Sequence, residues 1–302
     1  MDGEPPPATW GWLVVRASGP LATVQDLGRL GHAHEGVPPS GAADQRSHRL
    51  ANRLVGNLPG AATIEVTLGG LAVVLKGTGA VRSVALTGAP APLVVGGRPA
   101  ALYAPVAVRP GEAVVVGTPG RGLRSYLAVA GGVEVAAEVA SRSTDLLSGL
   151  GPPPLQPGQR LPLGGPIATG PAPGADVAAV SAPGGVAGRV RIVPGPRADR
   201  LGPGAWQELT SVTWIVAPTS NRVGLRLAGP RLATVPGELP PEGLCTGAVQ
   251  VPPGGHPVVF LADHPVTGGY PVVGVVDGDA DLAALAQLRP GDELRLGGPL
   301  MA

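Results

Sequence analysis

Glycine and proline interrupt the apolar stretches of this chain throughout, and this punctuation limits the elements that it can form. Together they make up more than a quarter of the 302 residues, with short Val- and Leu-rich runs such as "AVVVG" and "SYLAVAG" between them. Both residues destabilise long helices and mark turns. With 44% hydrophobic residues, the chain is long enough to bury a sizeable core. The sequence therefore predicts a mainly β fold of short strands joined by tight turns.

One phrase recurs three times along the chain. It reads "RPGEAVVVG" at 109–117, "QPGQRLPLG" at 156–164 and "RPGDELRLG" at 289–297. In each copy Pro-Gly makes a turn, a polar residue follows, and alternating apolar positions enter a half-buried strand. The pair Gly96-Gly97 predicts a further two-residue hairpin turn. Repeated turn-to-strand entries indicate barrels or duplicated modules.

The domain organisation follows from a change in composition. Residues 165–185 lose periodicity and charge together, which is typical of a linker. We therefore expect an N-terminal module at 10–165 and a C-terminal module at 186–300. Helices are expected only at 40–57, with Ser40 as its N-cap, and at "DLAALAQL".

Several classes of function are disfavoured. The net charge is +1 with the basic residues scattered, so no nucleic-acid partner is expected. No apolar run reaches about 18 residues and the first residues do not resemble a signal peptide, so we expect a cytoplasmic protein without a membrane partner. The single Cys245 excludes an internal disulfide, and we expect it to be buried. A Walker P-loop, a dinucleotide-binding fingerprint and a nucleophile elbow are all missing from the sequence.

The densest polar stretch is residues 23–46. Its functional side chains are Gln25, Asp26, Arg29, His32, His34, Glu35, Ser40 and Asp44. A loop entering a helix at Ser40 would offer free N–H groups to a carboxylate or phosphate. The alternative is an Asp26–Arg29 ion pair that fixes a turn, with Ser40 only a cap. The two histidines and Glu35 lack a definite third ligand, so no metal site is expected.

Two later loops carry further candidates. In "SNRVG", Asn221 and Arg222 follow a strand and can hold an anionic substrate, although a polar turn with a solvated Arg222 is equally compatible. In "ADHPVTGGYP", Asp263 and His264 can move protons and Tyr270 can donate a hydrogen bond. Gly268 and Gly269 would let the backbone approach a ligand. The alternative there is an acid-capped turn with Tyr270 in the core.

These segments occur in a characteristic order. "GPLATVQDLGRLGHAHEGVPPSGAADQRSHRLANRLVGN", "IEVTLGG", "YLAVAGGV", "SRSTDLLSG", "SNRVGLRLAGP", "GAVQVPPGGHPVVFLAD" and "TGGYPVVG" follow one another between about residues 12 and 297. Together they resemble the family of the C component of 5-oxoprolinase. It is also called the allophanate hydrolase subunit 2 or biotin-dependent carboxyltransferase family, and it includes the carboxyltransferase region of urea carboxylase and an antagonist of a sporulation kinase inhibitor.

The resemblance implies two cyclophilin-like β-barrel modules with one or two short helices. It implies ATP-dependent opening of 5-oxoproline to glutamate, in which a B component shares the ATP site and the substrate cleft and an A component completes hydrolysis. A lactam resists water because amide resonance must be broken, and phosphorylation of its oxygen makes it a better electrophile. Biotin is not expected on this chain, because the attachment signature "AMKM" is missing.

The resemblance also assigns residues. It places Asp26 and Tyr270 in the site, and together with the proton-transfer roles expected of Asp263 and His264 from their loop it predicts catalytic roles for all four residues. It places Gln25, Arg29, Ser40, Gly41, Asp44, Asn221, Arg222, Thr267 and Gly268 in substrate binding, and the backbone approach to a ligand expected at Gly269 adds that residue.

Two departures bear on the substrate. The family usually reads "ADRQTTGGYP" and "GAMD", where this chain has "ADHPVTGGYP" and "GAAD". His264 in place of a permanently charged arginine should weaken binding of a carboxylate or phosphate, or alter which lactam or amide is taken. Two alternatives remain open: transfer of a carboxyl group from carboxybiotin to a urea-like or amide acceptor, and non-catalytic binding of a kinase-inhibitor-like B component.

Overall fold

The chain forms two compact units, and each draws on separate stretches of sequence. The computed structural model describes residues 10–77, 81–165, 189–237 and 239–298. The first unit comprises Met1–Leu27, Ser47–Thr144 and Gly151–Ala182, and the second comprises Gly28–Arg46, Asp145–Leu150 and Pro183–Ala302. Two short segments of the N-terminal half therefore belong to the second unit. Residues 166–185 of the expected linker lie outside the described residues, and the module boundaries at 10–165 and 186–300 stay predictions.

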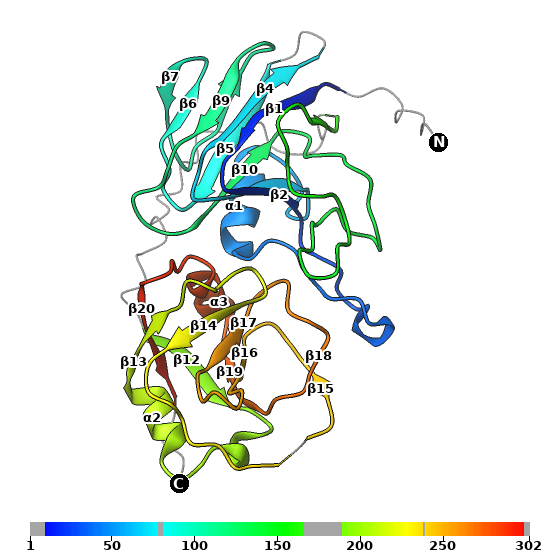
Figure 1. Cartoon of the computed structure of the whole chain (residues 1–302). Coiled ribbons are helices and arrows are strands. Elements are labelled where there is room, and N and C mark those ends of the chain that lie inside the picture. Colours follow the sequence, from blue (N-terminus) through cyan, green and yellow to red (C-terminus); the bar gives the residue numbers. More distant parts are fainter. Residues whose placement is uncertain (1–9, 78–80, 166–188, 238, 299–302) are drawn as a thin grey trace. The chain divides into compact units, whose positions relative to one another are not determined.

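The first unit contains a six-stranded antiparallel sheet. Its strands are β1 (Trp12–Ser18), β4 (Leu71–Lys76), β6 (Leu93–Val95), β7 (Arg98–Ala100), β9 (Ala113–Val116) and β11 (Arg160–Pro162). They lie in the order β11-β1-β4-β9-β6-β7. Figure 1 labels β1, β4, β9, β6 and β7 of this sheet. Burial alternates residue by residue along β4, which is the pattern of a strand with one face on a core. Gly96 and Gly97 join β6 to β7 with φ of 57° and 79°, so the predicted hairpin turn is confirmed.

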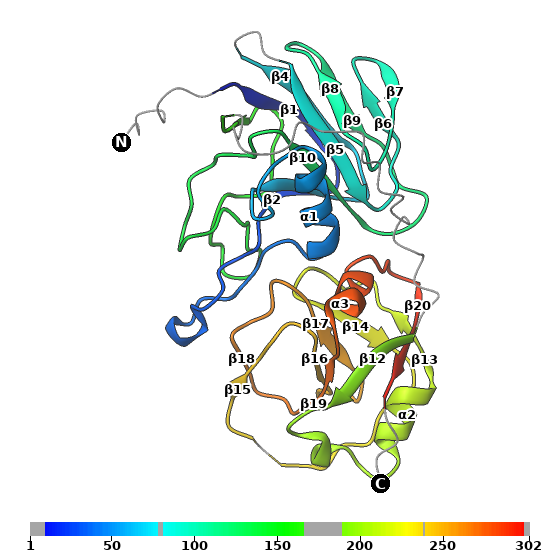
Figure 2. The same cartoon turned by 180° about the vertical axis from the view of Figure 1, so that it is seen from behind.

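A second sheet in this unit has five strands. They are β2 (Leu21–Gln25), β3 (Thr63–Thr67), β5 (Arg82–Gly88), β8 (Val106–Val108) and β10 (Arg124–Val129), in the order β2-β3-β10-β5-β8. The helix α1 (Gln45–Leu54) runs beside this sheet, as both views show (Figures 1 and 2). The hydroxyl of Thr87 donates to the carbonyl of Ser47 at 2.7 Å, which attaches the helix to β5.

A buried histidine lies between α1 and this sheet. His48 is fully buried, its Nδ1 lies 3.0 Å from Thr63 Oγ1, and its Nε2 lies 3.3 Å from Asn52 Nδ2. Burial lowers the pKa of His48 from 6.5 to about 4, although the carboxylates of Asp26 and Glu65 act in the opposite direction. The imidazole is therefore neutral at pH 7.

The second unit is built on a closed seven-stranded barrel. Its strands are β12 (Arg189–Pro194), β13 (Thr213–Val216), β14 (Gly224–Ala228), β16 (Ala248–Gln250), β17 (Val258–Phe260), β19 (Val272–Val276) and β20 (Glu293–Gly297). The ring order is β12-β19-β16-β17-β14-β13-β20, closed by the parallel pair β12 and β20. The helix α2 (Ala205–Ser211) contacts β20, and α3 (Asp279–Leu285) contacts β12. The predicted mainly β class is confirmed, with three α-helices in the described part of the chain instead of one or two.

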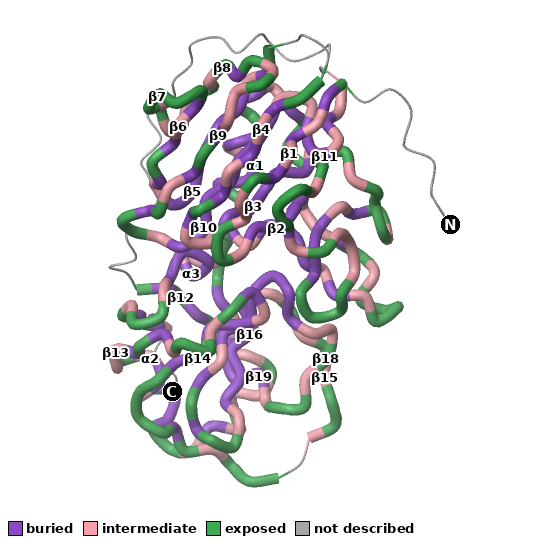
Figure 3. The backbone as a smooth tube through the Cα atoms, turned by 45° about the horizontal axis from the view of Figure 1, so that its top comes forward, coloured by how far each residue is buried: buried purple, intermediate pink, exposed green. Residues whose placement is uncertain are grey.

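Each unit has its own hydrophobic core. Figure 3 shows buried residues recurring along the strands of both units. The first core contains Leu13, Ile64 and Leu127 among others. The second contains the fully buried Trp214, whose indole N–H donates to the carbonyl of Leu209 at 2.9 Å. A buried tryptophan with a satisfied N–H anchors the barrel interior.

The three Pro-Gly phrases form the same turn in both units. Gly111, Gly158 and Gly291 each have φ of 90°, the left-handed value that a type II turn requires at its third position. In each turn the amide of the fourth residue donates to the carbonyl of the first, in the pairs Glu112 with Arg109, Gln159 with Gln156, and Asp292 with Arg289. The amide of the first residue in turn donates to the side chain of the fourth. The predicted turn-to-strand entries are confirmed, because β9, β11 and β20 begin directly after these turns.

Two local expectations were wrong. Helix α1 begins at Gln45, so Ser40 does not cap it, and the anion site expected at a helix start there does not form. Cys245 is exposed instead of buried. In the described part of the chain, no helix is both long and apolar enough to cross a bilayer.

Candidate functional site

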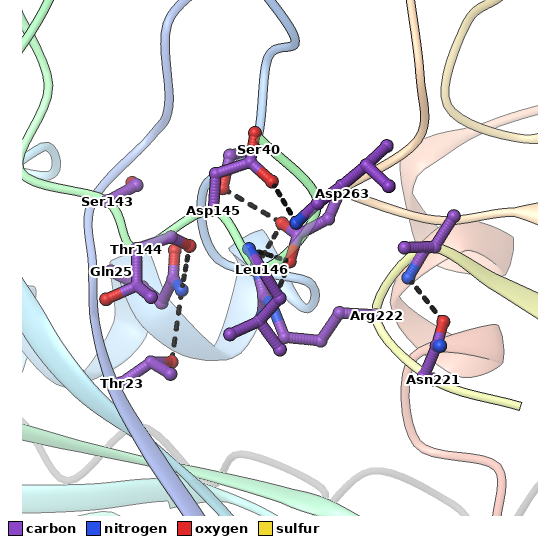
Figure 4. Close-up of polar contacts among 12 residues, drawn as sticks. Thr23, Gln25, Ser40, Ser143, Thr144, Asp145, Leu146, Asn221, Arg222 and Asp263 are labelled. Carbon is purple, nitrogen blue, oxygen red and sulfur yellow. Dashed lines mark hydrogen bonds and ion pairs between the residues drawn. The ribbon is translucent and has the colours of Figure 1, made fainter. Parts of the chain in front are cut away.

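The carboxylate of Asp263 is the centre of a buried polar network in the second unit. Asp263 follows β17 and is fully buried. Its Oδ1 accepts from Ser40 Oγ and from Arg222 Nη2, both at 2.9 Å, and its Oδ2 accepts from Arg222 Nε at 2.8 Å and from the amide of Leu146 at 3.3 Å (Figure 4). The guanidinium thus binds the carboxylate through two parallel hydrogen bonds, the strongest geometry for this pair.

Arg222 extends the network to a second chain segment. It is 1% exposed, and its Nη2 also donates to the carbonyl of Gly41 at 2.7 Å. Ser40, with φ of 50°, and Gly41 are therefore held by two residues that follow them by about 180 and 220 positions. Of the two interpretations of "SNRVG", the one with a solvated Arg222 is wrong. Removal of one partner from a buried pair of this kind leaves an uncompensated charge and is strongly destabilising.

Residues 28–41, called the excursion below, form a loop whose two ends are hydrogen-bonded to each other. The amide of Arg29 donates to the carbonyl of Pro39 at 2.7 Å, and Arg29 is buried. Gly28, at φ of 87°, allows this approach, because a Cβ there would lie 2.4 Å from the Pro39 oxygen. The residues between include the short 3-10 helix η1 (Ala33–Glu35) and are mostly exposed.

The loop at 145–150 was missed by the residue assignments from sequence. Asp145 organises it, because Oδ1 accepts from the amides of Leu147 (2.8 Å) and Ser148 (3.3 Å) and Oδ2 accepts from Ser148 Oγ (2.6 Å). The loop meets Asp263 through the Leu146 amide. The available signal was the polar segment "SRSTDLLSG", which contributed to the resemblance but to no predicted site residue.

A hollow of about 490 Å³ lies where three segments of the second unit meet. One wall comes from the excursion, one from the loop at 145–150, and one from the residues after Asp263. The lining residues are Ala33, His34, Gly36, Pro38, Leu147, Ser148, Pro265, Val266 and Thr267. The lining is mostly apolar with two hydroxyls and one imidazole, which suits a small amphipathic ligand.

His264 is buried next to this wall. Its Nδ1 lies 2.7 Å from the carbonyl of Pro265, and since a carbonyl only accepts, Nδ1 carries the proton. Burial lowers the pKa of His264, against the opposing effects of the Pro265 carbonyl and of the carboxylates of Asp263 and Asp145. The imidazole is therefore neutral at pH 7, with Nε2 as its acceptor nitrogen. Its predicted role in proton transfer stays a prediction.

The "TGGYP" segment is held by a short ribbon. Strand β18 (Thr267–Gly268) pairs with β15 (Glu242–Gly243), and Gln250 Nε2 donates to the carbonyl of Tyr270 at 2.6 Å. A Cβ at Gly268 would lie 2.8 Å from that Gln250 nitrogen, whereas one at Gly269 would meet open space. Gly268 is thus packed against Gln250, whereas the expected approach of a ligand to the backbone at Gly269 stays a prediction.

Three further predicted residues of the second unit differ in their exposure. Tyr270 is 46% exposed, so its placement in the core, the alternative considered, is wrong. Asn221 is exposed, and its Oδ1 accepts from the amide of Val223 at 2.8 Å. Asp44 accepts from Gln287 Nε2 at 2.8 Å. Tyr270 and Asn221 are accessible to a ligand, whereas Asp44 is buried.

Gln25 and Asp26 belong to the first unit. Gln25 Nε2 donates to Thr23 Oγ1 at 3.0 Å and to the carbonyl of Thr144 at 2.9 Å. Asp26 accepts from the hydroxyls of Ser141 (2.6 Å) and Ser143 (2.5 Å) and from the amide of Arg142 (2.6 Å). The structure therefore brings Ser40, Gly41, Arg222 and Asp263 into one network, and it places Gln25 and Asp26 in a network of the first unit.

The histidines near the tip of the excursion do not build a metal site. His32 Nδ1 lies 2.7 Å from Glu35 Oε2, and His34 Nδ1 lies 3.0 Å from the carbonyl of Gly31. Among the described residues there is no cluster of three or more His, Cys, Asp or Glu side chains that could hold a metal ion.

Comparison with known proteins defines the class. The family model "Carboxyltransferase domain, subdomain A and B" matches residues 35–297, and the chain belongs to this family. The resemblance found from the sequence is thereby confirmed.

Particular relatives extend this result. The C component of the 5-oxoprolinase of Escherichia coli (strain K12) is 35% identical over 289 residues, which cover 93% of this chain and 89% of that protein. The urea amidolyase of Lachancea kluyveri is 32% identical over 93% of this chain but only 16% of its own length. The crystal structure of TTHA0988 superposes with a TM-score of 0.84 at 35% identity, covering 97% of this chain and 56% of that chain.

Proposed function

We propose that this protein is the C component of an ATP-dependent 5-oxoprolinase that converts 5-oxo-L-proline to L-glutamate. The observation that carries the proposal is the match to a 5-oxoprolinase C component, at 35% identity over 93% of this chain and 89% of that protein. The urea amidolyase match involves a small part of a much longer protein.

The hollow of the second unit is the proposed site for the lactam. A five-membered lactam has an apolar ring edge and a polar amide, and the lining offers both kinds of contact. Pro38, Leu147 and Val266 supply apolar surface, while Thr267 supplies a hydroxyl. With about 490 Å³, the hollow is larger than such a ring requires, so a partner protein can contribute part of the cleft.

The lining does not fit the triphosphate of ATP. None of the residues that line the hollow is a lysine or an arginine, and the nearby Arg222 is bound to Asp263. Phosphate sites normally use cationic forks or free backbone amides. We therefore assign the nucleotide to the partner protein and derive no step of the reaction through it.

A partner B component is part of the proposal, and an A component completes the system. This chain covers just over half of TTHA0988, which leaves space in that chain for a second part of comparable size.

The test is reconstitution. The A, B and C components of the same organism are coexpressed, and glutamate release from 5-oxoproline is measured with and without ATP. Turnover that requires all three components supports the proposal, whereas folded components that form no glutamate contradict it. Thr267→Val should lower kcat/KM by roughly tenfold or more, because it removes a hydroxyl and keeps the shape. Thr234→Val, in the same unit but outside the hollow, is the matched control.

A second candidate is carboxyl transfer from carboxybiotin to a urea-like or amide acceptor. The family description and the urea amidolyase relative favour it. Because these 302 residues lack "AMKM", the biotin must be supplied from outside them. Carboxylation of urea by the reconstituted complex with a carboxylated biotin carrier would support this candidate over the first.

A further inference from the structure

The three walls of the hollow share one attachment. The excursion that supplies Pro38 is bound to Asp263 Oδ1 through Ser40 Oγ. The loop that supplies Leu147 and Ser148 is bound to Asp263 Oδ2 through the amide of Leu146. The third wall begins at Pro265, two residues after Asp263. One buried carboxylate is thus connected to every segment that lines the hollow.

The acceptor positions of this carboxylate are filled. Each oxygen accepts two hydrogen bonds, and a carboxylate offers about four lone-pair positions in all. The side chain is fully buried, and the donors from Arg222 and Ser40 belong to the protein itself. Asp263 has neither exposure to the hollow nor a spare lone pair with which to take a proton from a ligand.

We infer that Asp263 is a positioning residue that fixes the three walls of the substrate hollow, and that it does not itself transfer protons. The inference rests on the proposed function only in so far as the hollow takes the substrate. Arg222 holds the carboxylate in place and also binds Gly41. The walls are therefore set before the ligand arrives, and substrate affinity is the property that Asp263 controls.

The loop at 145–150 is the most sensitive wall. Its hydrogen bonds through Asp145 are internal, so they keep its shape but do not attach it to the barrel. The bond from Leu146 to Asp263 makes that attachment, and Leu147, which is 50% exposed, then lines the hollow. Loss of the Asp263 acceptor should release the loop as a unit.

Asp263→Asn tests the inference with little change of volume. Both oxygens face N–H donors of Arg222, so an amide nitrogen in either position meets a donor. Ser40→Ala removes one of the four donors and leaves the ion pair intact, so it gives a graded effect if Asp263→Asn folds poorly. The matched control is Asp277→Asn, because Asp277 pairs with Arg191 at 2.9 Å on the surface of the same unit.

Two measurements are made on each variant. Hydrogen exchange of the isolated chain follows the amides of residues 146–148, and steady-state kinetics of the complete three-component complex give kcat, KM and the pH profile for 5-oxoproline. In Asp263→Asn we expect exchange at 146–148 to rise by about tenfold or more. For the same variant we expect KM to rise by roughly tenfold, kcat to stay within about threefold of wild type, and the pH profile to be unchanged. Ser40→Ala should show smaller changes of the same kind, and Asp277→Asn should show none.

Other outcomes would overturn the inference. A fall in kcat of about a hundredfold or more at constant KM, with loss of one limb of the pH profile, would make Asp263 a proton-transfer group. Unchanged exchange at 146–148 in Asp263→Asn would show that the loop is held by other contacts. A wild-type complex without turnover would remove the proposed function, while the exchange result would still decide the positioning role.

Discussion

Asp26 and Asp263 are both buried carboxylates surrounded by donors, yet they organise their surroundings on different scales. Within the first unit, Asp26 gathers two hydroxyls and an amide from three consecutive residues, 141–143. Asp263 gathers a guanidinium, a hydroxyl and an amide from three segments separated by up to 182 positions. The first arrangement fixes the conformation of one loop, and the second assembles the walls of a hollow. Burial and saturation alone therefore do not say what a carboxylate does.

The largest expected effect is the loss of stability when the carboxylate of Asp263 is removed. Asp263→Ala leaves Arg222 charged and buried, so the free energy of unfolding of the second unit should fall by about 3–5 kcal/mol. Denaturant titration followed by hydrogen exchange of the barrel strands measures this. The double variant Asp263→Leu, Arg222→Leu should lose less than Asp263→Ala. If the single change costs less than about 1 kcal/mol, the guanidinium has an alternative partner and the contrast with Asp26 fails.

The two buried histidines give a second comparison, through pH. The folded chain keeps His48 neutral with a pKa of about 4, while the unfolded chain takes up a proton below 6.5. Stability is therefore fully retained above pH 6.5 and declines as the pH falls from 6.5 to 4, by about 3 kcal/mol from this residue. The pKa of His264 is also lowered, so the second unit should lose stability in the same direction below 6.5.

Denaturant midpoints between pH 7 and pH 4 measure this effect. His48→Asn should flatten the pH dependence of the first unit and leave that of the second unchanged, and His264→Asn should do the reverse. Equal slopes in wild type and His48→Asn would show that carboxylates alone cause the acid sensitivity.

Asp26→Asn should be milder than any change at Asp263. The hydroxyls of Ser141 and Ser143 can rotate to accept from an amide, whereas the guanidinium at Asp263 has donors only. We expect a loss of about 1–3 kcal/mol, measured as a shift of the calorimetric transition of the first unit. A loss larger than that of Asp263→Ala would reverse the comparison.

The smallest effect is expected at Asn221. Its side chain is exposed and accepts from amides of its own turn, so Asn221→Ala should cost about 0.5 kcal/mol in stability. Kinetics of the reconstituted complex then separate its two interpretations. A tenfold rise in KM would support the predicted substrate contact, and an unchanged KM would leave only the turn.

Local features were predictable from sequence, and distant pairings were not. The Pro-Gly turns were predictable because Pro at one position and Gly at the next select one backbone geometry. The start of α1 was misplaced, because Ser40 has the chemistry of a cap, and its hydroxyl instead donates to an aspartate 223 residues away. The residues adjacent in sequence to Ser40 and to Asp263 do not indicate that these two side chains pair. Arg222 illustrates the same limit, since a polar turn predicts solvation, whereas its ion pair with Asp263 places it in the interior.

The interleaving of the chain has a practical consequence for anyone who would dissect this protein. A fragment that starts after the linker would carry all seven barrel strands but neither Gly28–Arg46 nor Asp145–Leu150. Arg222 and Asp263 would then lose the cover and the hydrogen bonds supplied by Ser40, Gly41 and Leu146. Such a fragment would present a charged, incompletely bonded surface where the intact chain has a closed interior, so it is unsuited to mapping ligands.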